Sequence, residues 1–339
     1  MNPAQSHYNR FGLVRDMMQT PEIIAGYDTG LAVDTARRIA EVGRLMLTGE
    51  GSSRIFPAKH AIMQARRAGW PIALHTEAAR QAQEYDLGGW AVFAASNSGK
   101  TSEVIKLFHD LRAKGHRDCF GLTATPSSKL EEVAATTYVL GCGKEGAVAA
   151  TKSVVEQALF YHALVERIAG ADALRGALKE LGSHCRDALT AAIDPVITAK
   201  IAKAGTIYFA GRNDGVAEEL TLKTNEITRK KSDFLEGTYA AHGIEEVMNA
   251  DDVVIWIDPY DDSQQKFTEV LVKGVGMTVI AVSSRATPFP TIRVPESRFP
   301  SYVGMCAGWN LLVEAGIQLG IDLDKPQRAR KVGNEWIPT

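Results

Sequence analysis

The chain has 339 residues, of which 45% are hydrophobic and 23% are charged, with a formal net charge of −2 and a pI near 6.5. This length and composition fit two well-packed domains of ordinary size. The charges are balanced, with neither a basic block nor an acidic tail. The chain therefore lacks the basic surface typical of nucleic-acid-binding proteins, and we expect no nucleic acid partner.

Residues 1–30 read as a helical lead-in. The first residues, MNPAQSHYNRFGLVRD, lack the apolar core of a signal peptide, and no apolar run in the chain is long enough to span a bilayer. The four cysteines are scattered without a Cys-x-x-Cys pair, which favours buried, reduced thiols over disulfides or a zinc site. The reduced cysteines and the lack of signal-like and membrane-spanning runs lead us to expect a cytoplasmic protein with no membrane partner. No His/Asp cluster has the spacing of metal ligands, so we expect no metal and no organic cofactor.

Apolar, β-rich runs alternate with helical patterns along the rest of the chain. The expected strands are 44–51, 71–76, 90–96, 118–125 and 136–143 in the first half, and 206–213, 233–237, 253–259, 277–284 and 291–295 in the second half. Such alternation is typical of parallel sheets covered by helices on both faces, so the expected fold class is α/β.

The two halves also align with each other. The strand ending in Gly51 matches one ending in Gly211, at an offset of 160 residues, and the strand ending at Ser96 matches one ending near Asp258, at an offset of 162. This pattern predicts a duplicated α/β unit. We place the first domain at 31–185, the second at 190–325 and a C-terminal tail at 326–339, with a helical connection over 154–189.

A turn of small polar residues, Ser96-Asn97-Ser98-Gly99-Lys100-Thr101, follows the third expected strand. The helical pattern after it places Val104, Leu107 and Phe108 on one inward face. At such a turn, free backbone N–H groups, the helix dipole and the hydroxyls favour an anion, and Gly99 would let the backbone approach closely. The turn predicts an anion site, although the same residues would also suit a plain helix cap.

The corresponding turn of the second half is Asp258-Pro259-Tyr260-Asp261-Asp262. Three carboxylates at this position would repel an anion. We therefore expect only the first half to hold a phosphate-like group in this way. The second half should contribute other groups at the carboxyl ends of its strands.

Several motifs together resemble the sugar isomerase (SIS) family, and more closely the isomerase portion of glucosamine-6-phosphate synthase. They are Gly51-Ser52-Ser53, the Ser96–Thr101 turn, residues 144–152 (KEGAVAATK), residues 17–22 (MMQTPE), and Asp324-Lys325-Pro326 followed by Lys331. The resemblance covers almost the whole chain and implies two tandem SIS domains, each a flavodoxin-like three-layer unit. A glutaminase domain is not expected, so glutamine-dependent amidotransfer is not expected either.

The resemblance implies which residues hold the substrate. The residues that would grip a sugar phosphate are Ser52, Ser53, Ser96, Asn97, Ser98 and Thr101. Val148 falls where the family offers backbone groups to the sugar. Two positions depart from the family pattern, since Asn97 replaces a usual Gln and Lys100 stands where Glu is common.

The helix expected after Gly211 carries Lys223 and Glu226 three residues apart, on one face. Taken alone, the two residues read as a surface ion pair of little energetic value. The resemblance instead implies that Glu226 is the acid–base carboxylate and Lys223 its partner. In an aldose–ketose isomerisation, such a group takes a proton from carbon 2 and returns it to carbon 1 through an enediol.

The resemblance also implies a ring-opening histidine, His242, and a tail lysine, Lys331, that folds over the sugar and can form a Schiff base with a ketose. The loop departs from the family's "KHGP", because Ala241 and Ile244 replace the Lys and the Pro. In relatives this histidine reaches the site of the neighbouring subunit, so a homodimer is implied.

The leading hypothesis is therefore a ketose–aldose isomerase acting on a hexose with a phosphate, or a sulfonate, at carbon 6. Two alternatives stay open. One is a deaminase or deglycase of amino-sugar phosphates on the same scaffold, and the other is a sugar-phosphate sensor without catalysis. The sugar's stereochemistry does not follow from the sequence.

Overall fold

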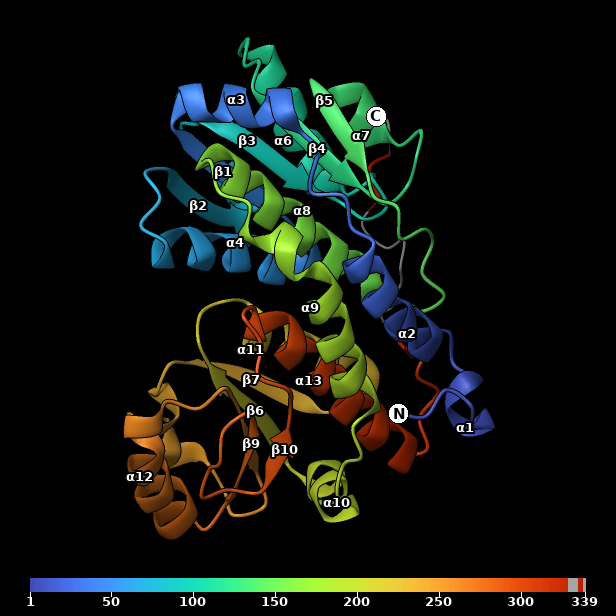
Figure 1. The fold of residues 1–339 in the computed structure, drawn as a ribbon, viewed down its shortest axis with the longest axis vertical. Helices are drawn as coiled ribbons and strands as arrows, with labels where there is room; N and C mark the ends of the chain where they lie inside the picture. The colour runs from blue at the N-terminus through green and yellow to red at the C-terminus, as the bar shows by residue number, and fades with distance from the viewer. Residues whose placement is uncertain (329–334, 338–339) are drawn as a thin grey trace. The chain divides into compact units, whose positions relative to one another are not determined.

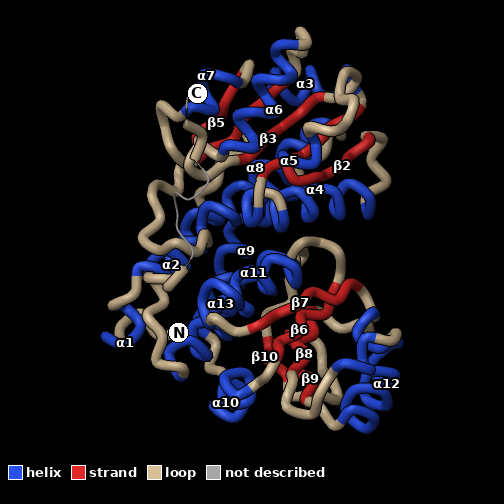
Figure 2. The backbone as a smooth tube through the Cα atoms, turned by 180° about the vertical axis from the view of Figure 1, so that it is seen from behind, coloured by secondary structure: helices blue, strands red, loops and turns tan. Residues whose placement is uncertain are grey.

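The structure is a computed structural model that describes residues 1–328 and 335–337. The chain forms two compact units, each containing one five-stranded sheet (Figures 1 and 2). The first-sheet unit comprises Gly26–Glu145, Lys152–Leu178 and Arg330–Thr339, and the second-sheet unit comprises Met1–Ala25, Gly146–Thr151 and Lys179–Ala329.

All strands of the first-sheet unit are parallel, in the order β2-β1-β3-β4-β5. They are β1 (Arg44–Gly49), β2 (Ala73–Ala78), β3 (Ala91–Ala95), β4 (Cys119–Thr123) and β5 (Thr136–Val139). The helices are α3 (Val33–Val42), the 3₁₀ helix η1 (Gly51–Ser53), α4 (Ile55–Arg67), α5 (Ala79–Ala82), α6 (Ser102–Ala113), α7 (Lys129–Val133) and α8 (Lys152–Ile168), and α9 (Ala173–Thr190) starts here and continues into the second-sheet unit.

The first sheet is buried on both faces, which explains why its central strands read as continuous apolar runs. On one face, Phe93 of β3 packs against Phe160 and Tyr161 of α8 at ring-centroid distances of 5.4 and 5.3 Å. On the other face, Val92 and the helices α5, α6 and α7 share one buried cluster. The unit thus has three layers, with α6 and α8 on opposite faces (Figures 1 and 2).

The second-sheet unit repeats this strand order, as β10-β9-β8-β6-β7, again all parallel. Its strands are β6 (Thr206–Gly211), β7 (Lys231–Glu236), β8 (Val253–Ile257), β9 (Thr278–Ser283) and β10 (Thr291–Arg293). Its helices are α1 (Ser6–Asn9), α2 (Gly12–Ala25), α10 (Pro195–Lys203), α11 (Val216–Thr228), α12 (Gln264–Phe267), a π-helix over Thr268–Val275 and α13 (Pro300–Gln318), with short 3₁₀ helices η2 (Tyr239–Ala241), η3 (Ile244–Val247) and η4 (Asp261–Ser263).

The core of the second-sheet unit is also layered. Helices α11 and α13 pack on each other, and α11 also packs on β6 and β7. The opposite face is covered by α12 and the π-helix, where Trp256 of β8 stacks on Phe267 at a centroid distance of 3.6 Å.

The predicted α/β class, the parallel sheets and the ten strands are confirmed. Several strand boundaries were wrong by a few residues, such as β5, which ends at Val139 and not at residue 143. The boundary that affects the alignment is that of β1, which ends at Gly49 because Gly51 already opens the 3₁₀ turn η1. With this correction the two sheets align at a constant offset, since Leu45 pairs with Ala91 and Ile207 pairs with Val253, each 162 residues further along the chain.

In a sheet with this order, the chain reverses direction across the sheet between the first and third strands. These positions are the β1/β3 pair in one unit and the β6/β8 pair in the other. Turns that follow these strands meet at the carboxyl edge of each sheet, where α/β proteins bind ligands. The turns containing Ser52 and Ser53, and Ser96 to Thr101, both lie at this edge of the first sheet.

All four cysteines are free and buried, as expected. Burial raises the pKa of Cys119 to about 12, which keeps this thiol protonated at neutral pH. None of the helices in the described part of the chain combines the length and apolar character needed to cross a bilayer.

Candidate functional site

The serine loop, which we define as Ser96–Thr101, connects β3 to α6. The hydroxyls of Ser96 and Thr101 are 2.7 Å apart and hydrogen-bonded, and the Thr101 N–H points to the Ser96 hydroxyl at 3.4 Å. The Lys100 N–H donates to the Ser98 hydroxyl at 3.2 Å. Thr101 is the N-cap residue of α6, yet no side chain among the described residues caps that turn. The loop therefore presents hydroxyls beside an uncapped helix start, an arrangement that favours an anion.

Gly99 shapes the serine loop in a way that the sequence did not reveal. Its φ of +64° lies in the left-handed region, and a Cβ at this position would meet Ser128 at 2.3 Å and Thr123 at 2.9 Å. The Gly99 carbonyl accepts a hydrogen bond from the Leu130 N–H at 2.9 Å. The close approach that requires glycine is thus to the start of α7, inside the protein.

Asn97 ties the serine loop to the Lys144–Lys152 motif. Its Nδ2 donates to Oε2 of Glu145 at 3.1 Å, and the same oxygen accepts from the Ser153 hydroxyl at 3.0 Å. Glu145 is buried, and sequence reasoning missed it because no local pattern pairs it with Asn97. The amide donor expected to face an anion is engaged by this carboxylate, and Asn97 Oδ1 is buried without a partner among the described residues.

Ser52 and Ser53 lie in η1, directly after the neighbouring strand β1, and both are half-buried. Ser53 Oγ is 3.5 Å from Nε2 of Gln157 on α8, at the outer limit of a hydrogen bond. Val148 is half-buried within Gly146–Thr151, which belongs to the second-sheet unit.

The Lys223–Glu226 pair on α11 is not a surface ion pair. The Lys223 side chain is only 1% exposed and its Nζ lies 2.5 Å from Oε2 of Glu226. A second carboxylate, Glu219, is fully buried and lies 3.3 Å from the same Nζ. The spacing of Glu219 four residues before Lys223 was visible in the sequence and could have revealed it. One buried cation thus holds two carboxylates, of which Glu226 is the more exposed, at 23%.

His242 is exposed, at the end of the 3₁₀ turn η2. Its Nε2 lies 3.2 Å from the Thr238 hydroxyl and 2.9 Å from Nζ of Lys266. Lys266 comes from α12, 24 residues further along the chain, and no sequence pattern pointed to this contact. Lys331 lies outside the described residues.

The acidic turn after β8, defined as residues 258–262, forms ion pairs that the sequence did not reveal. Arg212 Nη1 pairs with Asp258 at 2.6 Å, and Arg285 pairs with Asp258 at 3.0 Å and with Asp261 at 3.2 Å. The guanidinium of Arg212 also lies over the Tyr260 ring, 4.3 Å from its centroid. Arginines that follow β6 and β9 thus pair with two of the three carboxylates, Asp258 and Asp261, while Asp262 accepts a hydrogen bond from the Ser263 hydroxyl.

Asp214, in the loop after β6, is a buried carboxyl group. It accepts from the Ser301 hydroxyl at 2.7 Å and from the Val216 N–H at 3.1 Å. Burial raises the pKa of Asp214, because desolvation of the carboxylate outweighs these hydrogen bonds and the Arg212 charge. In the described part of the chain, no group of three or more His, Cys, Asp or Glu side chains has the arrangement of a metal site.

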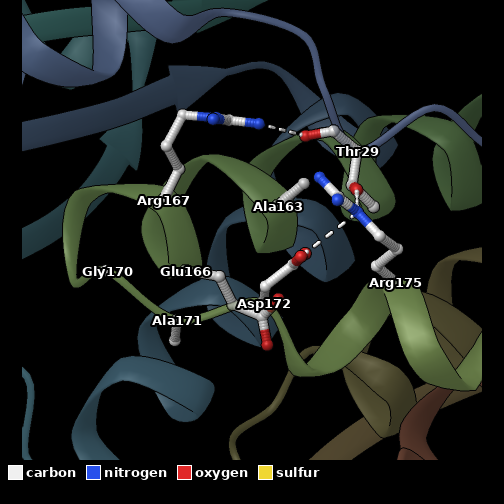
Figure 3. Close-up of a pocket in the computed structure, with 8 residues that line it drawn as sticks. All are labelled: Thr29, Ala163, Glu166, Arg167, Gly170, Ala171, Asp172 and Arg175. Atoms are coloured by element: carbon white, nitrogen blue, oxygen red, sulfur yellow. Dashed lines mark hydrogen bonds and ion pairs between the residues drawn. The ribbon is translucent and has the colours of Figure 1, made fainter.

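A cavity of about 230 Å³ at the turn between α8 and α9 contains none of the predicted site residues (Figure 3). Arg167 donates to the Thr29 carbonyl at 2.7 Å, and Arg175 contacts the Thr29 hydroxyl and Asp172 at 3.1 Å each. Glu166 accepts from the backbone at the start of α9. Arg175 and Glu166 thus have local partners that hold the turn, whereas Nε of Arg167 is buried without a hydrogen-bond partner among the described residues.

Comparison with known proteins supports the expected resemblance. Glutamine–fructose-6-phosphate aminotransferase [isomerizing] of Aeropyrum pernix is 25% identical over an alignment covering 97% of this chain and 58% of that protein. The protein of the same name from Lactiplantibacillus plantarum is 24% identical, over 70% of this chain and 42% of that protein. The resemblance to sugar isomerase proteins is confirmed. The chain spans about 58% of the length of the first of these relatives, and no protein-family model matches it.

Solved structures of sugar isomerase proteins share the fold. The C-terminal domain of glucosamine-fructose-6-phosphate aminotransferase from Francisella tularensis superposes with a TM-score of 0.78 at 17% identity, covering 95% of this chain and 100% of that one. Tagatose-6-phosphate ketose/aldose isomerase from Escherichia coli gives 0.76 at 16% identity, over 95% and 97%. Glucosamine-6-phosphate deaminase from Thermotoga maritima gives 0.73 at 20% identity, over 94% and 98%.

Proposed function

We propose that the chain interconverts a ketose and an aldose that carry an anionic group, a phosphate or a sulfonate, at carbon 6. The observation that carries this proposal is the Lys223–Glu226 pair. A buried lysine fixes Oε2 of Glu226 at 2.5 Å, while Oε1 of Glu226 has no hydrogen bond to a described residue. A carboxylate that is oriented through one oxygen and open at the other is suited to move a proton on a bound substrate.

The serine loop supports an anionic substrate. Its hydroxyls and the uncapped start of α6 offer neutral donors to a tetrahedral group, with the helix dipole favouring negative charge. Ser52 and Ser53 follow the neighbouring strand and would complete this donor set, with Val148 offering its backbone to the sugar. Phosphate and sulfonate share tetrahedral oxygens, so both are candidates for the anion.

The proposed chemistry conserves electrons. Glu226 removes the proton from carbon 2 of the open-chain aldose; the C–H electron pair becomes the C1=C2 double bond while the carbonyl π pair moves to O1, which takes up a proton to complete the enediol. The same carboxyl group then returns its proton to carbon 1 as the carbon-2 hydroxyl loses its proton and becomes the ketone carbonyl, so that one proton passes from O2 to O1 overall. His242 would open the sugar ring by moving a proton between ring and hydroxyl oxygens. Lys223 positions Glu226, and Lys331 would close the site. No external oxidant or reductant enters this balance.

The tandem arrangement of two SIS domains at 31–185 and 190–325, with a tail at 326–339, stays part of the proposal. So do a cytoplasmic location and a homodimer in which His242 reaches the site of the neighbouring subunit. His242 is exposed on its own unit, which such a role requires.

A deaminase or deglycase of amino-sugar phosphates is the second candidate. The observation that favours it is the His242 loop, where Ala241 and Ile244 replace the Lys and Pro of the usual motif and a lysine from α12 contacts the histidine. A glucosamine-6-phosphate deaminase shares this fold, and the same proton-moving carboxylate would serve that reaction. Release of ammonia from an amino-hexose phosphate, measured beside plain hexose phosphates, separates the two.

The test is a panel of hexoses with a 6-phosphate or 6-sulfonate, followed by NMR in deuterated water. The wild-type chain should incorporate deuterium at carbon 1 or 2 of one sugar. Glu226→Gln should still bind that sugar but exchange about 10²–10⁴-fold more slowly, the usual contribution of a general acid–base group. Glu246→Gln, at an exposed carboxylate, is the matched control and should exchange normally.

Two results would overturn the proposal. Normal exchange by Glu226→Gln would remove the acid–base assignment. Binding by the wild-type chain with no exchange on any sugar would favour the sensor over the enzyme.

A further inference from the structure

His242 and Lys266 are held near each other by one buried cluster of the second-sheet unit. Ala240 and Ala241, which directly precede His242 in η2, belong to this cluster. Phe267, which directly follows Lys266 in α12, belongs to it as well, and the two elements also contact each other. The two side chains therefore project from neighbouring positions that the core keeps in place.

The Lys266 ammonium approaches the imidazole of His242 along one edge of the ring. Its Nζ lies 2.9 Å from Nε2 and 3.5 Å from Nδ1. The Thr238 hydroxyl lies 3.2 Å from the same Nε2 and can donate to it too. An ammonium group only donates hydrogen bonds, so the ring nitrogen nearest to it accepts and carries no proton. The neutral imidazole then carries its proton on Nδ1.

The residue next to His242 cannot supply this ammonium. Ala241 stands where the resemblance expects a lysine, and it is only 4% exposed within the buried cluster. A charged side chain there would lose its hydration, at a high cost in free energy. Lys266 is instead half-buried and reaches the imidazole from α12. In this chain, the cation beside the histidine therefore comes from a helix 24 residues further on.

We propose that Lys266 is a positioning residue that acts through His242 when the sugar ring opens. It selects the imidazole tautomer with the proton on Nδ1, and it replaces the proton that Nδ1 gives to the sugar. We call this pair the His242–Lys266 relay. The inference rests on the proposed function, because it takes His242 as the group that opens the ring.

The relay step balances in protons and electrons. For an aldose, Nδ1 of His242 gives its proton to the ring oxygen O5 as the C1–O5 bond breaks and its electron pair goes to O5. Nε2 takes a proton from the Lys266 ammonium at the same time, so the imidazole stays neutral and changes only its tautomer. The hydroxyl on carbon 1 loses its proton to water while an electron pair of O1 forms the C1=O1 double bond. Lys266 then regains a proton from water, so that one proton passes from O1 to O5 overall.

The experiment compares Lys266→Met and Lys266→Arg with Lys273→Met in the full chain. Lys273 is an exposed lysine of the π-helix in the same unit and serves as the matched control. The first readout is nitrogen-15 NMR of histidine-labelled protein without ligand, which reports the tautomer of each imidazole. The His242→Gln variant identifies the signal of His242.

The second readout is ring opening, measured by exchange NMR as the rate at which the anomers of each hexose 6-phosphate or 6-sulfonate of the panel interconvert. All variants carry Glu226→Gln in this measurement, so that isomerisation does not interfere. Thermal unfolding shows that each variant is folded.

We expect the wild-type chain to hold His242 with Nδ1 protonated and Nε2 unprotonated. Lys266→Met should shift His242 toward the Nε2-protonated tautomer. It should also slow anomer interconversion about 10–100-fold, the range known for partners that fix a histidine tautomer in metal sites. Lys273→Met should match the wild type in both readouts.

Lys266→Arg separates the relay from simple orientation of the ring. The guanidinium still donates to Nε2, so the tautomer should be retained. It does not release a proton, so ring opening should stay as slow as in Lys266→Met.

The outcomes separate this inference from the proposed function. If Lys266→Met keeps the wild-type tautomer, or if Lys266→Arg opens the ring at the full rate, the relay is wrong, whatever the enzyme does. If both readouts follow the expectation but no sugar is isomerised by the wild-type chain, the inference stands and the proposed reaction fails. If the Glu226→Gln chain accelerates anomer interconversion of no sugar in the panel, His242 does not open the ring and the relay falls with that role.

Discussion

The turns that follow β3 and β8 occupy the same place in two sheets of identical strand order, yet their chemistry is opposite. After β3, neutral hydroxyls bond to each other, with Ser96 and Thr101 2.7 Å apart beside an uncapped helix. After β8, charged groups saturate one another, because Asp258 holds both Arg212 and Arg285. Among the described residues, the hydroxyls of the turn after β3 are hydrogen-bonded only within that turn and can still donate to a ligand. In the turn after β8, Asp258 is instead paired with two arginines of the same unit.

This difference shows that topology alone does not define a site. Both turns lie where ligands bind in such sheets, but only the side chains decide what can bind. In the second-sheet unit, the candidate acid–base groups lie on α11 and not in the turn after β8. On this helix a buried lysine pairs with two carboxylates. Substitutions in each unit can show whether the two units differ as strongly in energy as in geometry.

The largest expected effect is a loss of stability at the α11 cluster, which consists of Glu219, Lys223 and Glu226. Lys223→Met removes the cation that pairs with Glu219 and Glu226, and breaking a buried pair in this way costs about 3–5 kcal/mol of the free energy of unfolding. Urea unfolding followed by circular dichroism measures this loss. Lys203→Met, at an exposed lysine of the same unit, is the control and should change stability by less than about 0.5 kcal/mol. Equal stability of the two variants would show that the cluster is not held by its buried charge.

The serine loop should respond more weakly in stability but strongly in binding. Gly99→Ala places a methyl group 2.3 Å from Ser128 at a φ of +64°, which we expect to cost about 1–3 kcal/mol through crowding in addition to the cost of the left-handed conformation. Gly115→Ala is a matched control, because Gly115 has a φ of +78° with open space around it.

Only Gly99→Ala should also reduce phosphate affinity, measured by calorimetry. If both alanine variants bind phosphate equally well, the shape of the serine loop does not determine the anion site.

The acidic turn offers the complementary test. Asp258→Asn removes the charge shared by Arg212 and Arg285, and because these side chains are partly exposed we expect a loss of only about 1 kcal/mol in unfolding free energy. Phosphate affinity at the serine loop should not change. Asp262→Asn, at an exposed carboxylate of the same turn, is the control. A drop in phosphate affinity for Asp258→Asn alone would contradict the division of roles between the two turns.

Local patterns explain what the sequence could predict. The strands and the buried faces of α6 and α11 follow from periodic apolar residues, and Val104, Leu107 and Phe108 are buried as expected. The Lys223–Glu226 contact follows from helical spacing, and the missed Glu219 obeys the same rule, one turn earlier.

The contacts that shape the site come from distant parts of the chain and leave no local signal. Gly99 meets Ser128, Asn97 meets Glu145, and Arg285 meets Asp258 across 29, 48 and 27 residues, respectively. The hydrogen bond from the Trp336 N–H to the Lys100 carbonyl spans 236 residues. Each depends on how strands and turns stack at a sheet edge, which one sequence does not specify. This is why the ion pairs of Asp258 and Asp261 with Arg212 and Arg285 did not follow from the sequence.

The smallest expected effect is a pH dependence of stability that arises in the loop after β6. Burial raises the pKa of Asp214 in the folded chain, so the folded state holds this proton more tightly than the unfolded state does. The contribution of Asp214 to stability is therefore fully present below the unfolded pKa, near 4, and is lost as pH rises through the folded pKa. Asn cannot ionise, so the difference in unfolding free energy between wild type and Asp214→Asn should shift against the wild type as pH increases across that window. Subtracting the two urea-unfolding series cancels the other carboxyl groups, and a difference that is flat with pH would show that the Ser301 and Val216 hydrogen bonds fully compensate the buried charge.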